Sequence, residues 1–468
     1  MNVFASSEGS RRLRLAVAMS VALSIGALAW PAGAAPQAAE SERLEALEAE
    51  VAALAAELAA LAADGGGTPG ERLAEVERRL EILAAEIERL QLGEAAPEAD
   101  RVEHGMGPAA TKVYRVEQGL SIGGYGEMIY QGFDSRRDDG ADSGRTDQID
   151  FLRAIVYFGY KFNDDFVFNS EIEFEHASTG SGGEASVEFA YLDWLWRPEA
   201  NVRGGLLLVP MGLLNELHEP TVFATAKRPD VERALIPTTW RENGLGLWGD
   251  VGSVTYRTYL LNGLEASGFS AGGLRGGRQK GAQASAEDFA WVGRVDWTGV
   301  PGLLVGGSAY AGDSGQGLEL PDGGEVSVAT TLLEGHFDWR WQGLRLRGLA
   351  ARAELDDVAA LDLALGLTGN RSVGEEMTGW YVEAAYDLLA GRGGGRSLMP
   401  YVRWEELDTQ AEVPAGFVAN PANDVESLTL GVAFQPIDQI ILKADYQDYD
   451  NGAGTAIDQI NLALGYIF

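Results

Sequence analysis

The chain has 468 residues, including 61 glycines and no cysteine, and its formal charge is −34 because 70 acidic side chains outnumber 36 Lys and Arg. This acidity excludes nucleic acid as a partner, since too few basic side chains are present to neutralise phosphates. The glycines follow no Gly-x-y period, which excludes a collagen-like fibre.

The first segment has the pattern of a secretory signal peptide. Three arginines precede the apolar run LAVAMSVALSIGALAW, and PAGAA then supplies small residues for a cleavage site. We expect cleavage after Ala34, so that residues 1–34 are removed; an uncleaved anchor is the alternative. No later run of 18 or more apolar residues follows, so the mature chain is either soluble outside the cytoplasm or inserted in a membrane as a barrel.

Residues 40–92 have the pattern of a coiled coil. Leucine, valine and isoleucine recur in steps of three and four on both sides of the break DGGGTPG, as in a/d seams. The twelve-residue step from Leu61 to Leu73 does not keep the heptad phase. Two arrangements remain open, a parallel trimer of chains and an αα-hairpin within one chain. We place this segment in the periplasm and interpret residues 93–117 as a mobile tether.

Residues 118–468 consist of short runs in which apolar and polar side chains alternate. A period of two is typical of strands, and sixteen such runs are present. Brief connections, such as ND at 163, alternate with long ones, such as 210–243. Outer-membrane barrels have short turns at the periplasmic rim and long loops outside. We therefore predict an all-β fold, a sixteen-stranded antiparallel transmembrane β-barrel, preceded by the α-helical coiled coil.

The last nine residues, INLALGYIF, alternate up to a terminal aromatic residue. This pattern predicts that Tyr466 and Phe468 face outer-membrane lipid at the interfacial girdle and serve in assembly. The last strand is expected to pair with the first, GLSIGGYGEMIYQGF, because an open edge in lipid leaves backbone groups unpaired.

Charged side chains alternate with aromatic and aliphatic ones in several of these strands, which is expected if they line water inside a barrel. A soluble sheet with one wet face is the alternative reading. The predicted lumen-wall residues are Glu171, Glu173, Glu175, Glu334, His336, Asp338, Arg340, Lys443 and Asp445.

Three blocks are similar to porins of the phosphate-selective porin O and P family: LVPMGLLNELHEPTVFATAKRPDVERALIPTTWRENGLGLWG, GRVDWTGVPGLLVGGSAYAGDSGQG and LMPYVRWEELDTQ. The resemblance covers about 119–468 and implies a trimer of sixteen-stranded barrels whose third external loop folds inward to narrow the pore. Phosphate-selective members line the lumen with basic residues. The wall expected here is mixed, without an arginine ladder, so the resemblance is taken to imply a channel only.

The loop over 210–243 carries the densest charge cluster of the predicted barrel. Opposed charges across a narrow gap set a transverse field and a size limit, although the same charges can also pair with one another and pin the loop. We expect Arg228, Arg233 and Arg241 near the narrowest point. The full set of predicted constriction residues is Glu216, His218, Glu219, Lys227, Arg228, Glu232, Arg233, Arg241 and Glu242.

These patterns predict an outer-membrane porin for passive diffusion of small hydrophilic solutes, such as ions, assembled as a homotrimer. No nucleophile, base and orienter form a recognisable motif, so no catalytic residue or enzyme activity is predicted. No cofactor is expected, and no metal either, because a single imidazole such as His218 is more often hydrogen-bonded than ligating. The alternative is a structural outer-membrane protein tethered through its coiled coil, without channel activity.

Overall fold

The computed structural model describes residues 104–468, except 181 and 393–394. The predicted signal peptide and coiled coil, and the first part of the predicted tether, lie outside the described residues. Within the described part of the chain, no helix is long and apolar enough to cross a membrane.

Sixteen strands and a few short helices make up the described chain. The strands are β1 (Gly119–Phe133), β2 (Gln148–Lys161), β3 (Phe166–Glu175), β4 (Ala185–Arg197), β5 (Ala200–Leu208), β6 (Arg241–Val251), β7 (Val254–Asn262), β8 (Phe289–Val300), β9 (Leu303–Asp313), β10 (Ala329–Trp341), β11 (Leu344–Leu355), β12 (Glu376–Tyr386), β13 (Ser397–Glu412), β14 (Asp424–Ile437), β15 (Ile440–Asn451) and β16 (Gln459–Ile467). The helices are α4 (Lys112–Arg115), α5 (Val358–Leu365), the π-helical turn η2 (Val231–Leu235), and the 3-10 turns η3 (Ala266–Gly268), η4 (Arg275–Gly277), η5 (Gly369–Arg371) and η6 (Pro421–Asn423).

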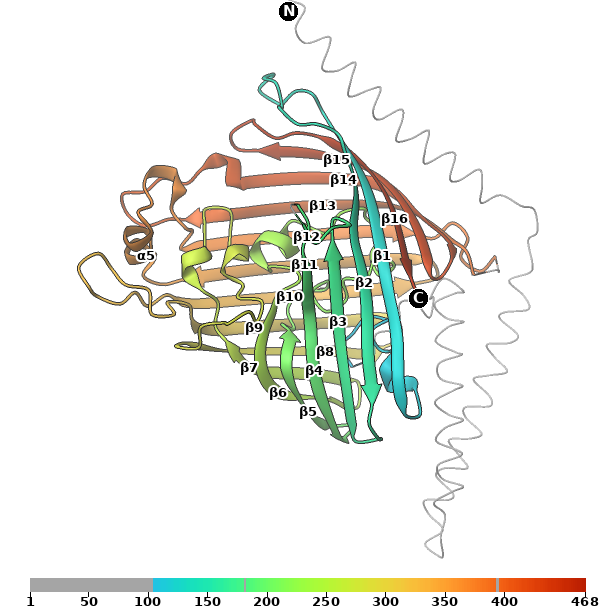
Figure 1. Cartoon of the computed structure of the whole chain (residues 1–468). Helices are drawn as coiled ribbons and strands as arrows, with labels where there is room; N and C mark the ends of the chain where they lie inside the picture. Colours follow the sequence, from blue (N-terminus) through green and yellow to red (C-terminus); the bar gives the residue numbers. More distant parts are fainter. Residues whose placement is uncertain (1–103, 181, 393–394) are drawn as a thin grey trace, which may run out of the picture.

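Each strand pairs with its neighbours in sequence, and β16 returns to pair with β1, so that the sheet is a closed barrel (Figure 1). All pairs are antiparallel, and the closing pair runs from Tyr125↔Ile467 to Phe133↔Gln459. The predicted sixteen-stranded antiparallel barrel is therefore confirmed. Closure leaves no strand edge unpaired, which is the condition for a sheet to span a bilayer.

The two rims of the barrel differ in the length of their connections. Segments 162–165 and 252–253 are short turns at the rim where β1 begins, whereas 209–240 and 263–288 are long segments at the opposite rim. Both ends of the barrel, Gly119 and Ile467, lie on the short-turn rim. This is the arrangement expected from the alternating connection lengths.

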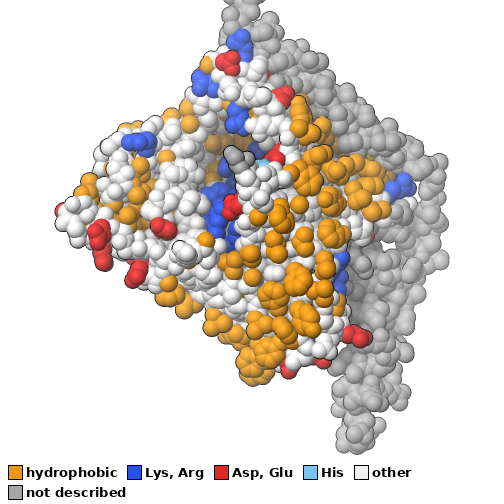
Figure 2. Space-filling model, viewed as in Figure 1, with side chains coloured by type: hydrophobic (Ala, Val, Ile, Leu, Met, Phe, Trp, Pro, Cys, Tyr) orange, Lys and Arg blue, Asp and Glu red, His pale blue; other side chains and the backbone are white. Residues whose placement is uncertain are grey.

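The outward face of the strands is apolar, and its aromatic side chains gather beside the short turns. Trp194 and Trp196 flank the β4–β5 turn with 45% and 60% of their surface exposed, and Trp339 stacks on Trp341 beside the β10–β11 turn. Figure 2 shows the hydrophobic outer face on the side of the barrel formed by β1 to β5. Amphipathic rings are favoured at the level of lipid headgroups, so this face fits a bilayer.

The C-terminal residue completes the closure. The Phe468 N–H donates to the Gly124 carbonyl at 2.9 Å, and the Gly124 N–H donates to the Phe468 carbonyl at 3.0 Å. A side chain at Gly124 would meet the Phe468 ring at 2.7 Å, so the absence of a Cβ there lets the ring cover the strand. Half of the Phe468 surface stays exposed on the outer side.

Deletion of Phe468 is expected to lower the folded fraction in lipid vesicles several-fold, because the two closing hydrogen bonds and the ring contact are lost. The folded fraction is measured by the faster migration of unheated barrels in SDS gels. Val418→Ala, at a position 67% exposed in the loop between β13 and β14, is the matched control. Equal folding of the deletion variant and the control would contradict a role for Phe468 in assembly.

Candidate functional site

The segment from Val209 to Trp240, between β5 and β6, enters the barrel and is called here the inner loop. Its backbone reaches wall strands on opposite sides of the barrel. The Val231 N–H donates to Glu405 of β13 at 2.6 Å, and the Ala226 N–H donates to Asp445 of β15 at 2.7 Å. On the other side, the Gly212 carbonyl accepts from Arg294 of β8. The inner loop therefore crosses the lumen, as the resemblance implies for the third external loop.

The predicted bounds of this loop need one correction. Arg241 and Glu242 are the first residues of β6, so they belong to the wall. The Arg241 Nη1 atom donates to Glu188 at 3.0 Å, and only 3% of the Arg241 surface is exposed. Arg241 is thus an ion-paired wall residue, whereas we expected it near the narrowest point together with Arg228 and Arg233.

Most of the predicted constriction residues are buried in specific pairs. The carboxylate of Glu232 accepts from the Tyr381 hydroxyl at 2.6 Å and from the Leu214 N–H at 2.7 Å. Glu242 accepts from Asn262 at 2.7 Å. The buried members of the predicted set are Glu216, His218, Glu219, Glu232, Arg241 and Glu242. The Tyr381 contact fixes the inner loop to β12, whereas the Glu242 contact joins two wall strands. Of the predicted set, Lys227 and Arg228 are partly exposed and Arg233 is exposed.

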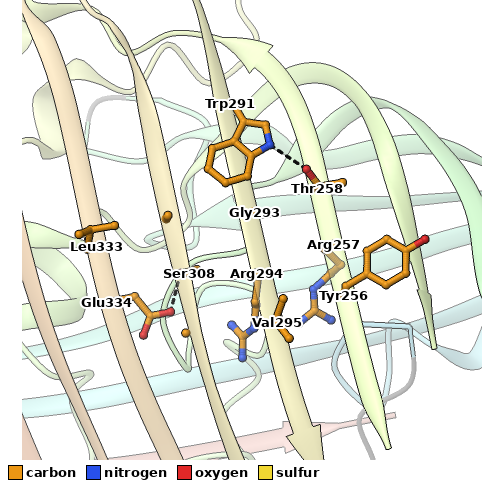
Figure 3. A pocket seen from close by; sticks show the side chains of 12 residues that line it. Tyr256, Arg257, Thr258, Trp291, Gly293, Arg294, Val295, Ser308, Leu333 and Glu334 are labelled. Atoms are coloured by element: carbon orange, nitrogen blue, oxygen red, sulfur yellow. Dashed lines mark hydrogen bonds between the residues drawn. The ribbon is translucent and has the colours of Figure 1, made fainter. Parts of the chain in front are cut away.

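A network of buried ion pairs joins the inner loop to strands β7, β8 and β10. Asp296 lies at the centre, 2.7 Å from Arg257, 2.8 Å from Arg294 and 2.9 Å from His336. Glu216 of the loop contacts Arg257 at 3.3 Å. Figure 3 shows Arg257 and Arg294 side by side on their neighbouring strands. Each charge here is satisfied by an opposite charge, which is the condition for burying it.

Arg294→Met is expected to lower the free energy of unfolding by about 3–5 kcal/mol, because it leaves Glu216 and Asp296 without one of their buried partners. Urea titration of the protein in lipid vesicles, followed by tryptophan fluorescence, measures the loss. Arg352→Met serves as the control, since the Arg352 side chain is 55% exposed and its pairing with Glu354 contributes about 1 kcal/mol or less. A similar small loss in both variants would contradict this assignment.

On the side of the barrel formed by β11, β13 and β15, wall residues also contact the inner loop. Arg345 donates to the Val222 carbonyl at 3.1 Å, and Arg403 donates to the Thr225 hydroxyl at 3.0 Å. The Lys443 ammonium group lies 3.6 Å from the centre of the Phe223 ring, a cation–π contact. These contacts come from residues more than a hundred positions away in the chain, and together they hold the stretch 222–225 against the wall.

All nine predicted lumen-wall residues lie on the inward side of their strands, but they do not all line water. The six that are buried against the inner loop or against other wall residues are Glu171, Glu173, Glu334, His336, Lys443 and Asp445. Glu175, Asp338 and Arg340 are partly exposed. The expectation that charged inward positions all face an aqueous channel is wrong at these six positions, because the inner loop occupies the space beside many of them.

The wall carries more arginine than the predicted set of wall residues contains. Seven further wall arginines lie in ion-pair contact with carboxylates of inward-facing residues. They are Arg153, Arg203, Arg257, Arg294, Arg345, Arg347 and Arg403. Because each of these guanidinium groups has an acidic partner, the seven arginines do not present a run of unpaired positive charges. Extending the period-two reading to every strand would have found these arginines, since they alternate with outward apolar residues.

The described part of the predicted tether, residues 104–117, packs inside the barrel instead of extending freely. The carboxylate of Glu219, in the inner loop, accepts from the Ala109 N–H at 3.0 Å and from the Ala110 N–H at 3.2 Å. Val113 of α4 contacts the inner surface at Gly159 of β2, which leaves it 1% exposed. This packing was not predicted from the sequence, because the segment is short and its apolar residues follow no helical or strand period.

Side chains of this segment also join the wall network, and residues 104–115 are called here the inner N-terminal segment. The Tyr114 hydroxyl donates to Asp193 at 2.7 Å and accepts from Arg203 at 3.1 Å. Asn169 donates to the Ala110 carbonyl at 2.9 Å. The segment therefore fills part of the lumen between the inner loop and the short-turn rim, beside β1 to β5.

Basic side chains gather at the long-loop mouth of the barrel, where Figure 2 shows blue atoms inside the hollow. Arg275 and Arg278 donate to the Thr238 carbonyl at 2.8 and 2.7 Å, which brings the β7–β8 loop against the inner loop. Arg228 donates to the His218 carbonyl at 3.2 Å. Among the described residues, Arg228, Arg275 and Arg278 form no ion pair with a carboxylate. Burial, and after it the charges of Arg278 and Arg228, lower the pKa of Arg275 below its ordinary value, as expected for crowded cations.

No family model matches the chain. A protein of Aquifex aeolicus (strain VF5), described as "Uncharacterized protein", is 38% identical over 374 residues, which cover 77% of this chain and 83% of that protein. Among solved structures, OmpF of Salmonella typhi in complex with daunomycin has a TM-score of 0.50 at 12% identity, covering 75% of this chain and 98% of OmpF. The channel DcaP of Acinetobacter baumannii has a TM-score of 0.47 at 12% identity, with 75% and 97% covered. At such identities the likeness to OmpF concerns the porin-like fold alone.

Proposed function

Since this chain belongs to the family of the Aquifex aeolicus protein and folds as a closed sixteen-stranded barrel, we propose that it is an outer-membrane channel for passive diffusion of small hydrophilic solutes. The observation that carries the proposal is a wall that is apolar outside and charged inside, with the inner loop suspended across the lumen. An apolar outer band with a polar interior is the general design of outer-membrane channels.

The mouth cations favour small anions among the solutes. Arg228, Arg275 and Arg278 crowd the long-loop entrance, whereas the carboxylates of the inner loop are turned to buried partners. Rings of basic side chains at a constriction favour anion passage because they lower the electrostatic barrier to entry. A specific preference for phosphate, as in the porin O and P family, would require further unpaired basic side chains along the lumen.

We infer the assembly from the sequence outside the described residues. Three copies joined by a periplasmic coiled coil over 40–92 fit the heptad pattern and the position of the barrel's first strand at the short-turn rim. The barrel then carries its long loops to the exterior. If the two heptad runs instead form a hairpin within one chain, the oligomer is held by the barrel surfaces alone. Replacement of Leu54 and Leu80 by Asp distinguishes the two arrangements, because it lowers the mass of the detergent-solubilised oligomer only if the coiled coil joins different chains.

Planar-bilayer recording of the purified full chain tests the proposed function. Discrete conductance steps are expected, with a reversal potential in a salt gradient that has the sign of anion preference. A folded protein that inserts in the bilayer but never conducts would instead support the alternative, a structural outer-membrane protein tethered through its coiled coil. Heat-modifiable migration in SDS gels establishes folding independently of conductance.

A further inference from the structure

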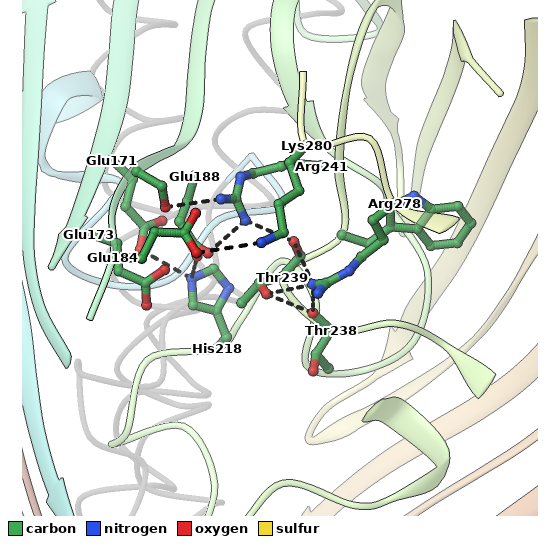
Figure 4. Close-up of polar contacts among 12 residues, drawn as sticks. Glu171, Glu173, Glu184, Glu188, His218, Thr238, Thr239, Arg241, Arg278 and Lys280 are labelled. Carbon is green, nitrogen blue, oxygen red and sulfur yellow. Dashed lines mark hydrogen bonds and ion pairs between the residues drawn. The ribbon is translucent and has the colours of Figure 1, made fainter. Parts of the chain in front are cut away.

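One cluster on the wall has a composition that the channel function does not require. His218 of the inner loop meets Glu171 of β3 and Glu188 of β4, and all three side chains are at most 2% exposed (Figure 4). The His218 Nε2 atom lies 3.2 Å from Glu171 Oε1 and 3.3 Å from Glu188 Oε2. The three potential ligand atoms lie within 4.8 Å of one another.

The other ring nitrogen fixes the orientation of the imidazole. His218 Nδ1 lies 2.8 Å from the Asn215 carbonyl, which can only accept, so Nδ1 carries a proton. Nε2 is then directed at two carboxylate oxygens. Three acceptor groups facing one another require a cation between them, which is either a proton on Nε2 or a metal ion. A ligating histidine commonly donates its second N–H to a backbone carbonyl in this way.

The distances favour the metal. A charge-assisted N–H···O bond is about 2.7–2.9 Å long, shorter than both separations at His218. A tetrahedral Zn²⁺ ion with bonds of about 2.0–2.2 Å holds its ligand atoms about 3.3–3.5 Å apart, close to the separations found. The two separations at His218 Nε2 are therefore closer to the spacing of two ligand atoms on one ion than to that of a short charge-assisted hydrogen bond.

The charge balance and the unpartnered atoms point the same way. Glu171 Oε2 and Glu173 Oε1 are buried and accept no hydrogen bond within the described chain. Among the described residues, Arg153 contacts the carboxylate of Glu173 and Arg241 that of Glu188, and these are the only Lys or Arg side chains in ion-pair contact with the two carboxylates. Arg153 is shared with a further carboxylate, that of Glu127. Negative charge thus exceeds positive charge here, and a divalent cation would offset the excess.

The wall is locally reshaped to bring Glu188 into the cluster. Glu171 pairs with Phe189 while Ile172 pairs with Val187, so Glu188 is the extra residue of a β-bulge. As a result, the consecutive residues Glu188 and Phe189 are both buried on the inner side. Bulges commonly redirect a side chain beside functional sites at the expense of regular pairing. Donors behind the ligands complete the site, since Arg241 donates to Glu188 Oε1 at 3.0 Å.

We propose that Glu171, Glu188 and His218 bind one divalent metal ion of the type of Zn²⁺. This ion would join the inner loop to strands β3 and β4. One imidazole and two carboxylates suit Zn²⁺ better than Ca²⁺ or Mg²⁺, which prefer oxygen ligands alone. Because the ligands come from the loop and the wall, the ion would act as a clip that fixes the inner loop in the lumen. This assignment depends on the fold and not on the conductance of the channel.

Metal analysis of the folded full chain tests the site. After chelator treatment and reloading with Zn²⁺, about one ion per chain is expected to survive dialysis, and Co²⁺ should give the visible absorption bands of a tetrahedral site. His218→Gln is expected to weaken Zn²⁺ binding by about 100-fold or more. His176→Gln is the matched control, because His176 pairs with Asp150 on an exposed loop and should leave binding unchanged.

Two results would overturn the proposal. One is a reloaded wild-type protein that keeps no Zn²⁺, which would assign the cluster to a protonated imidazole between two carboxylates. The other is Zn²⁺ binding that survives His218→Gln in a folded protein. If His218→Gln does not fold, as judged by its migration in SDS gels, Glu188→Gln replaces it, because this substitution keeps the side-chain shape while removing a ligand charge.

Discussion

A variant lacking residues 104–115 is expected to pass several times more current per open channel than the full chain. The inner N-terminal segment fills the lumen beside β1 to β5, where it contacts the inner loop through Glu219 and the wall through Asn169 and Asp193. Conductance rises with the cross-section of the aqueous path, so removal of this segment widens the half of the lumen that faces the short-turn rim. The barrel should remain folded, since closure depends on the sheet and not on this segment.

Single-channel recording in planar bilayers measures the change in conductance. Two further variants are compared with the deletion, one expected to have no effect and one expected to have an intermediate effect. Deletion of residues 321–324, which are exposed in the β9–β10 loop, is the control and should leave conductance unchanged. Glu219→Gln weakens the acceptor of the Ala109 and Ala110 N–H groups and should give an intermediate increase. An unchanged conductance of the folded deletion variant would show that the segment does not obstruct the path of the solute.

The second large effect concerns selectivity. Replacement of Arg228, Arg275 and Arg278 by Gln is expected to move the reversal potential toward cation preference, with about a tenfold change in the anion-to-cation permeability ratio. A tenfold ratio corresponds to about 1.4 kcal/mol, and one unit charge at 4 Å contributes about 1 kcal/mol even at the dielectric constant of water. Three such charges at a narrow mouth therefore suffice for the change, after allowance for screening by salt.

The matched control removes the same number of charges elsewhere. Arg136, Arg145 and Arg371 are exposed in loops at the long-loop rim, and their replacement by Gln changes the net charge equally. Because these positions are outside the mouth cluster, the control variant should keep the wild-type reversal potential. An equal shift of the reversal potential in both triple variants would show that selectivity depends on the overall charge of the loops. If neither variant shifts the reversal potential, the mouth arginines do not determine selectivity.

The sequence was sufficient for the features that depend on local periodicity. Alternation along each strand and the difference between short and long connections predicted the sixteen strands, their antiparallel order and the pairing of the last strand with the first. The inward side of the nine predicted wall residues followed from the same period, because successive side chains of a strand point to opposite faces. The predicted bounds of the inner loop were wrong at Arg241 and Glu242, where the charged start of a strand resembles a loop.

Only the tertiary structure decided which of the inward charges meet. The wall carboxylates of Asp445 and Glu405, for example, accept hydrogen bonds from the backbone N–H groups of Ala226 and Val231 in the inner loop. These partners are far apart in the sequence, and no local pattern relates them. Closure of the barrel places the inward faces of all strands around one enclosed space. The buried charges of the inner loop, which has no sequence period of its own, are paired with wall residues in that space. For the same reason the bulge at Glu188 and the inner N-terminal segment were not predicted: their conformations are set by contacts inside the barrel and not by neighbouring residues in the chain.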